Sequence, residues 1–228
     1  MVTLKIDNNR YTIDGNPRIE QWQELMKWDF ESHVHWPHII HAVTNISMDI
    51  IKQMNAEQQR LAVTMIAHAV SERKQVELPN FDEMNFGQFV DLEYLLAHGT
   101  DKALPKILEK LNANYEYTQE ALYVVETYIK WRTNLYKQYS ALFGLDELQD
   151  DVEPTVTAKS RQPYKVAAEW YRLMVELAND DILKIRQITE LQVKEVLNFM
   201  AVRKEKRLAE ARKQKEQKKQ YDLQRARR

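Results

Sequence analysis

Cysteine is absent from the chain, and glycine and proline are scarce. With no cysteine among 228 residues, disulfide bonds, thiolate metal sites and cysteine nucleophiles are excluded. Four glycines and six prolines are too few for glycine-rich phosphate loops or for the many tight turns of an all-β fold. These scarcities favour a mainly α fold.

Long hydrophobic runs are also missing. The sequence contains no stretch near the ~18 consecutive apolar residues of a membrane span, and no basic start followed by an apolar run of signal-peptide length. We therefore expect no membrane partner. Hydrophobic residues make up 44% of the chain and charged residues 29%, which is typical of a folded soluble protein with a sizeable core.

The net charge of −1 hides a strong asymmetry. Residues 201–228 contain twelve basic and four acidic side chains, a net charge of +8, so the first 200 residues carry −9. Such a basic arm suits nucleic-acid phosphates or an acidic protein surface, including another copy of the chain, although it is equally typical of a solvated helix without a partner. The basic arm residues singled out are Arg203, Lys204, Lys206, Arg207, Arg212, Lys213, Lys215, Lys218 and Lys219.

Local patterns predict a short hairpin followed by helices. Alternating apolar residues over 2–13 predict a β-hairpin, and Asn16 with Pro17 predicts the start of a helix over 17–29. Asn55 and Gln58 form a capping-box pattern ahead of an apolar stretch that ends at Val70, which we expect to be the central buried helix. His68, inside that stretch, is expected to be a core histidine that bonds to Thr64.

Further helices are expected along the rest of the chain. One should run over 85–98 and stop at Gly99, Pro105 should start another, and 115–139 is the longest periodic segment before the tail. Aromatic side chains in 115–139 favour a core or a helix interface over base stacking. Apolar spacing predicts two more helices, at 167–178 and from 193 onwards.

The expected architecture is a multi-helix bundle with a short N-terminal β-hairpin and a long C-terminal basic helix or arm. We divide it into residues 1–145 (hairpin plus helical body), 146–162 (an acidic, proline-containing linker), 163–200 (a C-terminal helical pair) and 201–228 (the basic arm). The arm lacks a sustained apolar seam, so an isolated 201–228 peptide is expected to be disordered or only partly helical.

Catalytic signatures are missing from the sequence, so we expect no enzyme and no cofactor. There is no nucleophile elbow, Walker loop or Rossmann glycine run. Imidazoles in a cluster of four histidines could ligate Zn²⁺ or Ni²⁺, which makes a metal-dependent enzyme an alternative, but packing beside Trp36 and bonding to backbone carbonyls is the preferred interpretation. These weak metal candidates are His33, His35, His38 and His41.

Three stretches follow a pattern shared with one group of proteins. The first runs from Leu4 to Asp29 and places Arg18-Ile19-Glu20-Gln21-Trp22 after the hairpin. The second is Asn85-Phe86-Gly87-Gln88-Phe89-Val90-Asp91-Leu92 running into Leu104-Pro105-Lys106-Ile107-Leu108. The third is Asp180-Asp181-Ile182-Leu183-Lys184-Ile185 through Leu197-Asn198-Phe199-Met200-Ala201. With these stretches the chain resembles tailed-bacteriophage tail and baseplate assembly proteins and tail assembly chaperones.

The resemblance implies a non-enzymatic role in phage assembly through protein–protein contacts. The implied partners are other phage tail or baseplate proteins, the implied location is the host cytoplasm during assembly or the virion, and a homo-oligomer is compatible with this role. The long basic tail after Arg203 departs from the pattern of that group. Nucleic-acid binding through the basic arm is the alternative function.

Overall fold

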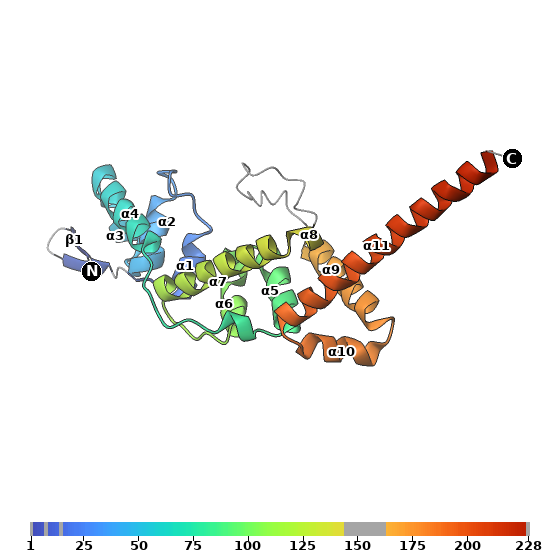
Figure 1. Ribbon diagram of the computed structural model, residues 1–228. Coiled ribbons are helices and arrows are strands. Elements are labelled where there is room, and N and C mark those ends of the chain that lie inside the picture. Colours follow the sequence, from blue (N-terminus) through green and yellow to red (C-terminus); the bar gives the residue numbers. More distant parts are fainter. Residues whose placement is uncertain (1, 7–8, 14–15, 144–162, 227–228) are drawn as a thin grey trace. The chain divides into compact units, whose positions relative to one another are not determined.

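The computed structural model describes residues 2–6, 9–13, 16–143 and 163–226 (Figure 1). Within these residues the fold is mainly α, as predicted, and the predicted linker at 146–162 lies outside them. The elements are β1 (Val2–Ile6), β2 (Asn9–Ile13), α1 (Ile19–Leu25), α2 (Trp36–Thr44), α3 (Met48–Ile51), α4 (Ala56–Ser71), the 3-10 helix η1 (Phe81–Glu83), α5 (Phe86–Ala97), α6 (Thr100–Lys110), α7 (Thr118–Gln138), α8 (Ser140–Phe143), α9 (Pro163–Ala178), α10 (Ile182–Glu190) and α11 (Val193–Ala226).

The chain divides into two compact units, each assembled from segments that are distant in sequence. Unit 1 takes residues 1–79, 91–129 and 162–166, and unit 2 takes residues 80–90, 130–161 and 167–228. The division falls within α5, α7 and α9. The local sequence pattern does not reveal it, because each of these helices is continuous in its hydrogen bonding and its apolar repeat.

The N-terminal hairpin of unit 1 forms where the alternation of apolar residues predicts it. Strands β1 and β2 pair antiparallel, with Val2 opposite Ile13 and Leu4 opposite Tyr11. Strand β2 contacts α2, which also contacts α1, α3 and α4. The hairpin is therefore part of the helical unit, since an isolated two-stranded hairpin is marginally stable in water.

Helix α4 begins with the predicted capping box but is not a central buried helix. The Asn55 side chain accepts a hydrogen bond from the Gln58 amide at 2.8 Å, and the Gln58 side chain accepts one from the Asn55 amide at 2.9 Å. However, Leu61 is 52% exposed and the His68 side chain is 75% exposed. The prediction of a core histidine is wrong, because this face of α4 is left open; His68 lies beside Glu72, and the Thr64 hydroxyl bonds to the Arg60 carbonyl.

The start of α1 also differs from the prediction, because long-range bonds occupy the expected capping groups. The Pro17 carbonyl accepts hydrogen bonds from the Thr118 amide at 2.9 Å and the Thr118 hydroxyl at 2.8 Å. The Asn16 side chain donates to Glu120 at 2.9 Å, and its oxygen accepts from the Gln119 amide at 3.1 Å, so it caps the start of α7 and not that of α1. Residues 16 and 17 are thus bound to the start of α7, and α1 spans only Ile19–Leu25.

Pro105 lies inside α6 and does not start it. The helix begins at Thr100, after Gly99, whose φ of +96° places it in the region that glycine favours, as expected for a helix-ending residue. A proline has no N–H, so the Asp101 carbonyl loses its partner one turn earlier. The side chain of Gln23 supplies the replacement and donates to that carbonyl at 3.0 Å.

This replacement bond can be tested with a double-mutant cycle. Gln23→Leu removes the donor and should lower the free energy of unfolding by about 1 kcal/mol. In a Pro105→Ala background the substituted residue has a backbone amide that can bond to the Asp101 carbonyl, so the same Gln23→Leu change should cost less. Urea unfolding of the four proteins measures the coupling, and an equal cost in both backgrounds would contradict our account.

The core of unit 2 is a cluster of aromatic rings. Trp170 of α9 meets Phe86 and Phe89 of α5 edge-on, with ring centroids 5.7 and 5.4 Å apart. Phe143 of α8 contacts Trp170 and Tyr136. Gly87 allows α10 to pack closely against α5, because a Cβ at that position would lie only 3.1 Å from the Cβ of Thr189.

Candidate interaction surfaces: the C-terminal helix and the turn before α10

Helix α11 begins at a short backbone pairing within unit 2. The Phe86 amide donates to the Leu191 carbonyl at 2.8 Å, and the Val193 amide donates to the Met84 carbonyl at 3.1 Å. These two bonds flank an antiparallel bridge between Asn85 and Gln192. They hold the turn between α10 and α11 against the segment that precedes α5, and so fix the direction in which α11 leaves the core.

A carboxylate of η1 fixes the first turn of α11. Asp82 accepts a hydrogen bond from the Trp131 indole at 2.8 Å and is bridged by Lys194 of α11 at 2.8 Å. The hydrogen bonds from Lys194 and Trp131 hold the pKa of the Asp82 carboxyl below its ordinary value of 3.8. Because Asp82 is exposed, this contact orients the helix more than it stabilises the fold.

Four further side-chain contacts attach the next turns of α11. The Tyr139 hydroxyl donates to the Asn198 side chain at 2.7 Å, and Lys204 donates to the Ala141 carbonyl in α8. Arg203 donates to the Glu176 carbonyl at 3.1 Å, and Arg207 pairs with the Glu176 carboxylate at 2.5 Å. Together with the buried side chains Val193, Val196 and Leu197, these contacts anchor the helix over residues 193–207.

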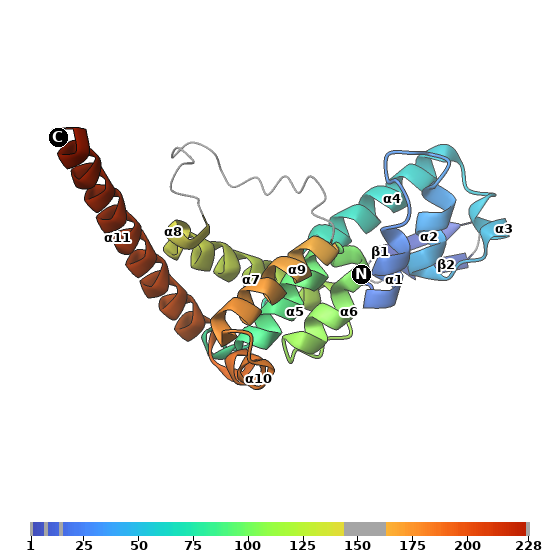
Figure 2. The same cartoon turned by 90° about the vertical axis from the view of Figure 1, so that its right-hand side faces the viewer.

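Beyond this anchor, α11 continues without packing. Every residue from Glu205 to Gln220 is exposed, and Figures 1 and 2 show the C-terminal part of α11 extending past the other elements of unit 2. A helix that is polar on all sides does not normally persist alone, because its first turn is costly to form. Here the packed turns at 193–204 supply that first turn, and the exposed part extends it.

The structure divides the nine predicted basic residues into two groups. Arg203, Lys204 and Arg207 bind α8 and α9 and therefore belong to the anchor. Among the residues that the structure describes, the other six make no ion pair and are exposed: Lys206, Arg212, Lys213, Lys215, Lys218 and Lys219. The expectation of an unfolded isolated arm concerns a peptide without its anchor, and it stays a prediction.

Sequence reasoning missed a second exposed feature, the turn that leads into α10. Ile182 and Leu183 are each 76% exposed, more than any other large hydrophobic residue in the described part of the chain. Periodicity alone does not single them out, since Ile182 and Leu183 read as ordinary core positions of a helix. Phe199 and Val202 of α11 are also exposed, by 59% and 65%.

The predicted histidine cluster is a packing arrangement around Trp28. His38 stacks on the Trp28 ring at 4.3 Å and His35 tilts against it at 5.5 Å, whereas Trp36 instead bonds through its indole to the Phe30 carbonyl. His35 accepts from the Asp29 amide, His41 donates to the Ile46 carbonyl, and His33 is exposed. No group of three or more metal-ligating side chains occurs among the described residues.

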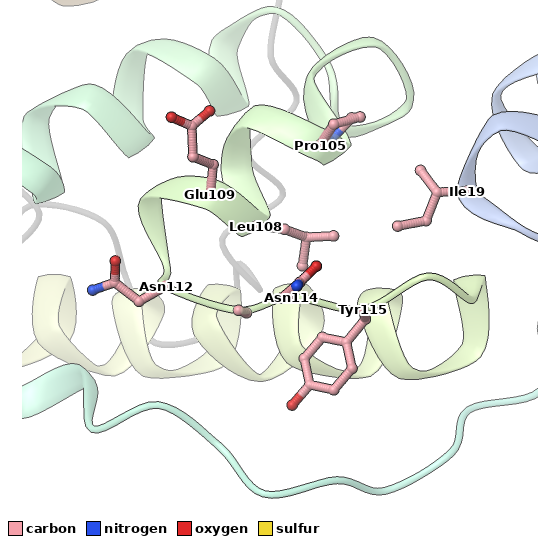
Figure 3. Close-up of a pocket in the computed structure, with 8 residues that line it drawn as sticks. Ile19, Pro105, Leu108, Glu109, Asn112, Asn114 and Tyr115 are labelled. Carbon is pink, nitrogen blue, oxygen red and sulfur yellow. The ribbon is translucent and has the colours of Figure 1, made fainter.

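An open hollow in unit 1 lies between α6 and the start of α1. It is lined by Ile19, Pro105 and Leu108, with the amides of Asn112 and Asn114 beside them (Figure 3). In Figure 3 the only carboxylate of the lining, Glu109, points away from Ile19 and Leu108. The lining also includes Tyr115, whose hydroxyl donates to the Glu77 carbonyl at 2.9 Å.

Within the residues described, no helix is both long and apolar enough to cross a membrane. The exposed part of α11 and the turn before α10, with its exposed residues Ile182 and Leu183, are two candidate interaction surfaces. A comparison of the chain with models of protein families, with curated proteins and with solved structures found no match.

Proposed function

We propose that the protein is a non-enzymatic structural or assembly protein that acts through protein–protein contacts. The observation that carries this proposal is the exposed pair Ile182 and Leu183. Two adjacent aliphatic side chains held in water have an unfavourable hydration free energy, which is recovered when a partner covers them. Such anchors dominate the affinity of protein interfaces when they enter a complementary pocket.

The exposed pair is held in a defined conformation. Asn179 and Asp180 both adopt left-handed backbone conformations, with φ of 51° and 62°, a region that Asn and Asp enter more readily than other residues except glycine. Asp181 then caps α10 by accepting from the Leu183 amide at 3.0 Å. That bond, followed by the contact with Lys184, lowers the pKa of the Asp181 carboxyl. A turn fixed by such a cap loses less conformational entropy on binding.

Phage tail or baseplate proteins are the partners that we propose. The third stretch of the resemblance to tail and baseplate assembly proteins contains Ile182, Leu183 and Phe199, so the shared pattern and the exposed apolar side chains coincide. On this proposal the protein acts in the host cytoplasm during assembly, and both retention in the virion and self-association are compatible with it. Nucleic-acid binding is a second candidate function, favoured by the exposed basic part of α11 and argued in the next subsection.

The proposal is tested by capturing partners with the full chain. Immobilised protein is exposed to a nuclease-treated lysate that contains phage tail and baseplate components, and the retained proteins are identified by mass spectrometry. Wild type should retain tail or baseplate proteins. The variant Ile182→Gln/Leu183→Gln should retain at least about tenfold less, because two lost anchors of ~1 kcal/mol each exceed the 1.4 kcal/mol of a tenfold change.

A matched control uses exposed apolar residues of unit 1. Val34 is 64% exposed and Leu61 is 52% exposed, so Val34→Gln/Leu61→Gln makes the same chemical change elsewhere. This variant should retain partners as wild type does. Recovery of no tail or baseplate protein by wild type would refute the phage assignment, and equal losses in both variants would refute the role of the turn before α10.

A further inference from the structure

We infer that the exposed part of α11 is a binding element for double-stranded DNA and lies along its major groove. This inference deepens the second candidate function and does not depend on the assembly role. It concerns residues 205–220, where every residue is exposed and seven basic residues, of which Arg207 is paired with Glu176, stand against three acidic ones. A net positive charge attracts polyanions in general, so the placement of the charges has to identify the partner.

The basic residues are spread around the helix and do not form one face. At 100° per residue, the six cations of 205–220 that make no ion pair fall into two groups, separated by sectors of about 100° and about 120°. Lys206 and Lys213 point to one side, and Arg212, Lys215 and Lys219 point to the opposite side. A flat acidic protein surface would contact only one of these sides. A groove between two phosphate backbones contacts both at once.

One of the two sectors without cations fits the open side of a groove. This sector of about 100°, between Arg212 and Lys213, contains two of the three carboxylates, Glu205 and Glu216. A helix in a groove has a backbone on each flank, base edges beneath it, and solvent above it, so carboxylates, which phosphates repel, belong on the solvent side. The third carboxylate, Glu210, lies one turn from Lys206, which offsets its charge. The second sector, of about 120° between Lys206 and Lys218, would face the base edges and carries Glu210, Gln214 and Gln217, whose side chains can accept from or donate to bases.

The dimensions and composition favour duplex DNA over other polyanions. The major groove of B-DNA is about 12 Å wide and admits an α-helix, whereas the major groove of duplex RNA is too narrow and deep for side chains to read. Residues 205–220 contain no aromatic side chain, so the stacking platform that binds single strands is missing there. The segment also lacks the apolar seam that a coiled coil with a second copy requires.

The first experiment measures the binding of the full chain to a fluorescent duplex of about 20 base pairs across a salt series. A single strand of the same sequence is the second probe, and poly-glutamate is the competitor. Wild type should bind the duplex at least about tenfold more tightly than the single strand. Poly-glutamate at equal charge should compete poorly, since it offers no groove.

The matched variants differ only in where four charges are removed. The flank variant carries Arg212→Gln, Lys213→Gln, Lys215→Gln and Lys219→Gln, and glutamine preserves the helix propensity of these exposed positions. It should lose at least about tenfold in affinity at 0.1 M salt, and the slope of log K against log salt should fall by about 3 to 4. The control removes four exposed lysines outside α11 (Lys52, Lys102, Lys106 and Lys165) and should bind as wild type does.

Several results would overturn the inference. They are no duplex binding at low salt, equal or tighter binding to the single strand, full competition by poly-glutamate, or equal losses in the flank variant and the control. Circular dichroism of each variant confirms that the helix is retained. The DNA-binding assay uses purified components, so a negative result would refute the DNA inference without bearing on the proposed assembly role. A failure to capture tail proteins would likewise leave the DNA-binding result unaffected.

Discussion

Replacing Trp170 with alanine should destabilise unit 2 by about 3 to 5 kcal/mol. Trp170 is 8% exposed and its ring meets those of Phe86, Phe89 and Phe143. These three rings come from α5 and α8, so truncation of the indole leaves a cavity where three helices meet. Rigid helices cannot fully collapse onto such a cavity, and the lost contacts therefore add to the lost hydrophobic transfer.

Hydrogen exchange measured by mass spectrometry reports the loss of local stability around Trp170. Peptides that cover 86–90 and 167–178 should exchange at least about 100-fold faster in Trp170→Ala, since 1.4 kcal/mol corresponds to a factor of ten. The neighbouring residue provides the control: Tyr171 is 54% exposed, and Tyr171→Ala should change these rates little. Similar rates in the two variants would show that the aromatic cluster is not the core of unit 2.

The second large effect is expected at Glu120, which joins three segments of unit 1. This buried carboxylate accepts hydrogen bonds from the Asn16 side chain at 2.9 Å and from Lys74 at 2.8 Å. The neighbouring Gln119 bonds to the Ala69 carbonyl at 3.0 Å. Glu120→Ala leaves the donors of Asn16 and Lys74 without their acceptor and should lower the free energy of unfolding by about 2 to 3 kcal/mol.

A surface carboxylate four residues earlier is the control for Glu120. Glu116 pairs with Arg18 at 3.1 Å, but both side chains are more than half exposed. Glu116→Ala should therefore cost less than about 1 kcal/mol. Urea unfolding followed by circular dichroism compares the two variants. Equal stability of the two variants would show that the Glu120 network contributes no more to the free energy of unfolding than an exposed ion pair.

The same network predicts how stability depends on pH. Burial raises the pKa of the Glu120 carboxyl, but the hydrogen bonds from Asn16 and Lys74 outweigh burial, and the pKa lies below its ordinary value of 4.5. The stabilisation is therefore complete above pH 4.5 and is lost as the pH falls through the folded-state pKa. Glu120→Gln, which does not titrate, should lack this acid-dependent loss.

Lys74 adds a change of the opposite sign at high pH. Its hydrogen bond to Glu120, and then the charge of Glu120, raise the pKa of the Lys74 ammonium above 10.5. The stabilisation is present below pH 10.5 and is lost as the pH rises through the raised value. Because the Lys74 side chain is 64% exposed, water screens the pair and the basic limb should be the shallower one. Unfolding curves recorded across both limbs measure the difference.

Sequence reasoning succeeded where the determining contacts are local. The Asn55 cap involves a residue three positions away, and the hairpin follows from alternation over a few residues. It failed where the partner is distant. Asn16 is predicted to cap the helix that follows it, but its side chain accepts from the amide of Gln119 and donates to Glu120, 103 and 104 positions further on. Pro105 looks like a helix start, but a side chain from α1 binds the carbonyl that this proline leaves unpaired inside α6.

The same distinction between local and distant contacts applies to the candidate surfaces. The charge of the basic arm can be counted in the sequence, but the separation of Arg203, Lys204 and Arg207 from the six exposed cations follows from their contacts with α8 and α9. The pair Ile182 and Leu183 could not be found at all, because an apolar residue in a helical pattern normally indicates burial. Their exposure of 76% is seen only in the tertiary structure, where they follow the left-handed turn at Asn179 and Asp180.

By itself, the amino-acid sequence determined the helical class, the hairpin and the charge asymmetry, since composition and short-range periodicity act through neighbouring residues. Tertiary structure decided which apolar faces are buried, which polar groups pair and where α11 becomes free of the core. These outcomes depend on segments brought together from distant positions, and burial and hydrogen bonding act only between groups that meet in space. The charge of the stretch from Glu205 to Gln220 can be counted in the sequence. Its exposure is a tertiary property, because the contacts of α11 with the rest of unit 2 end at Arg207.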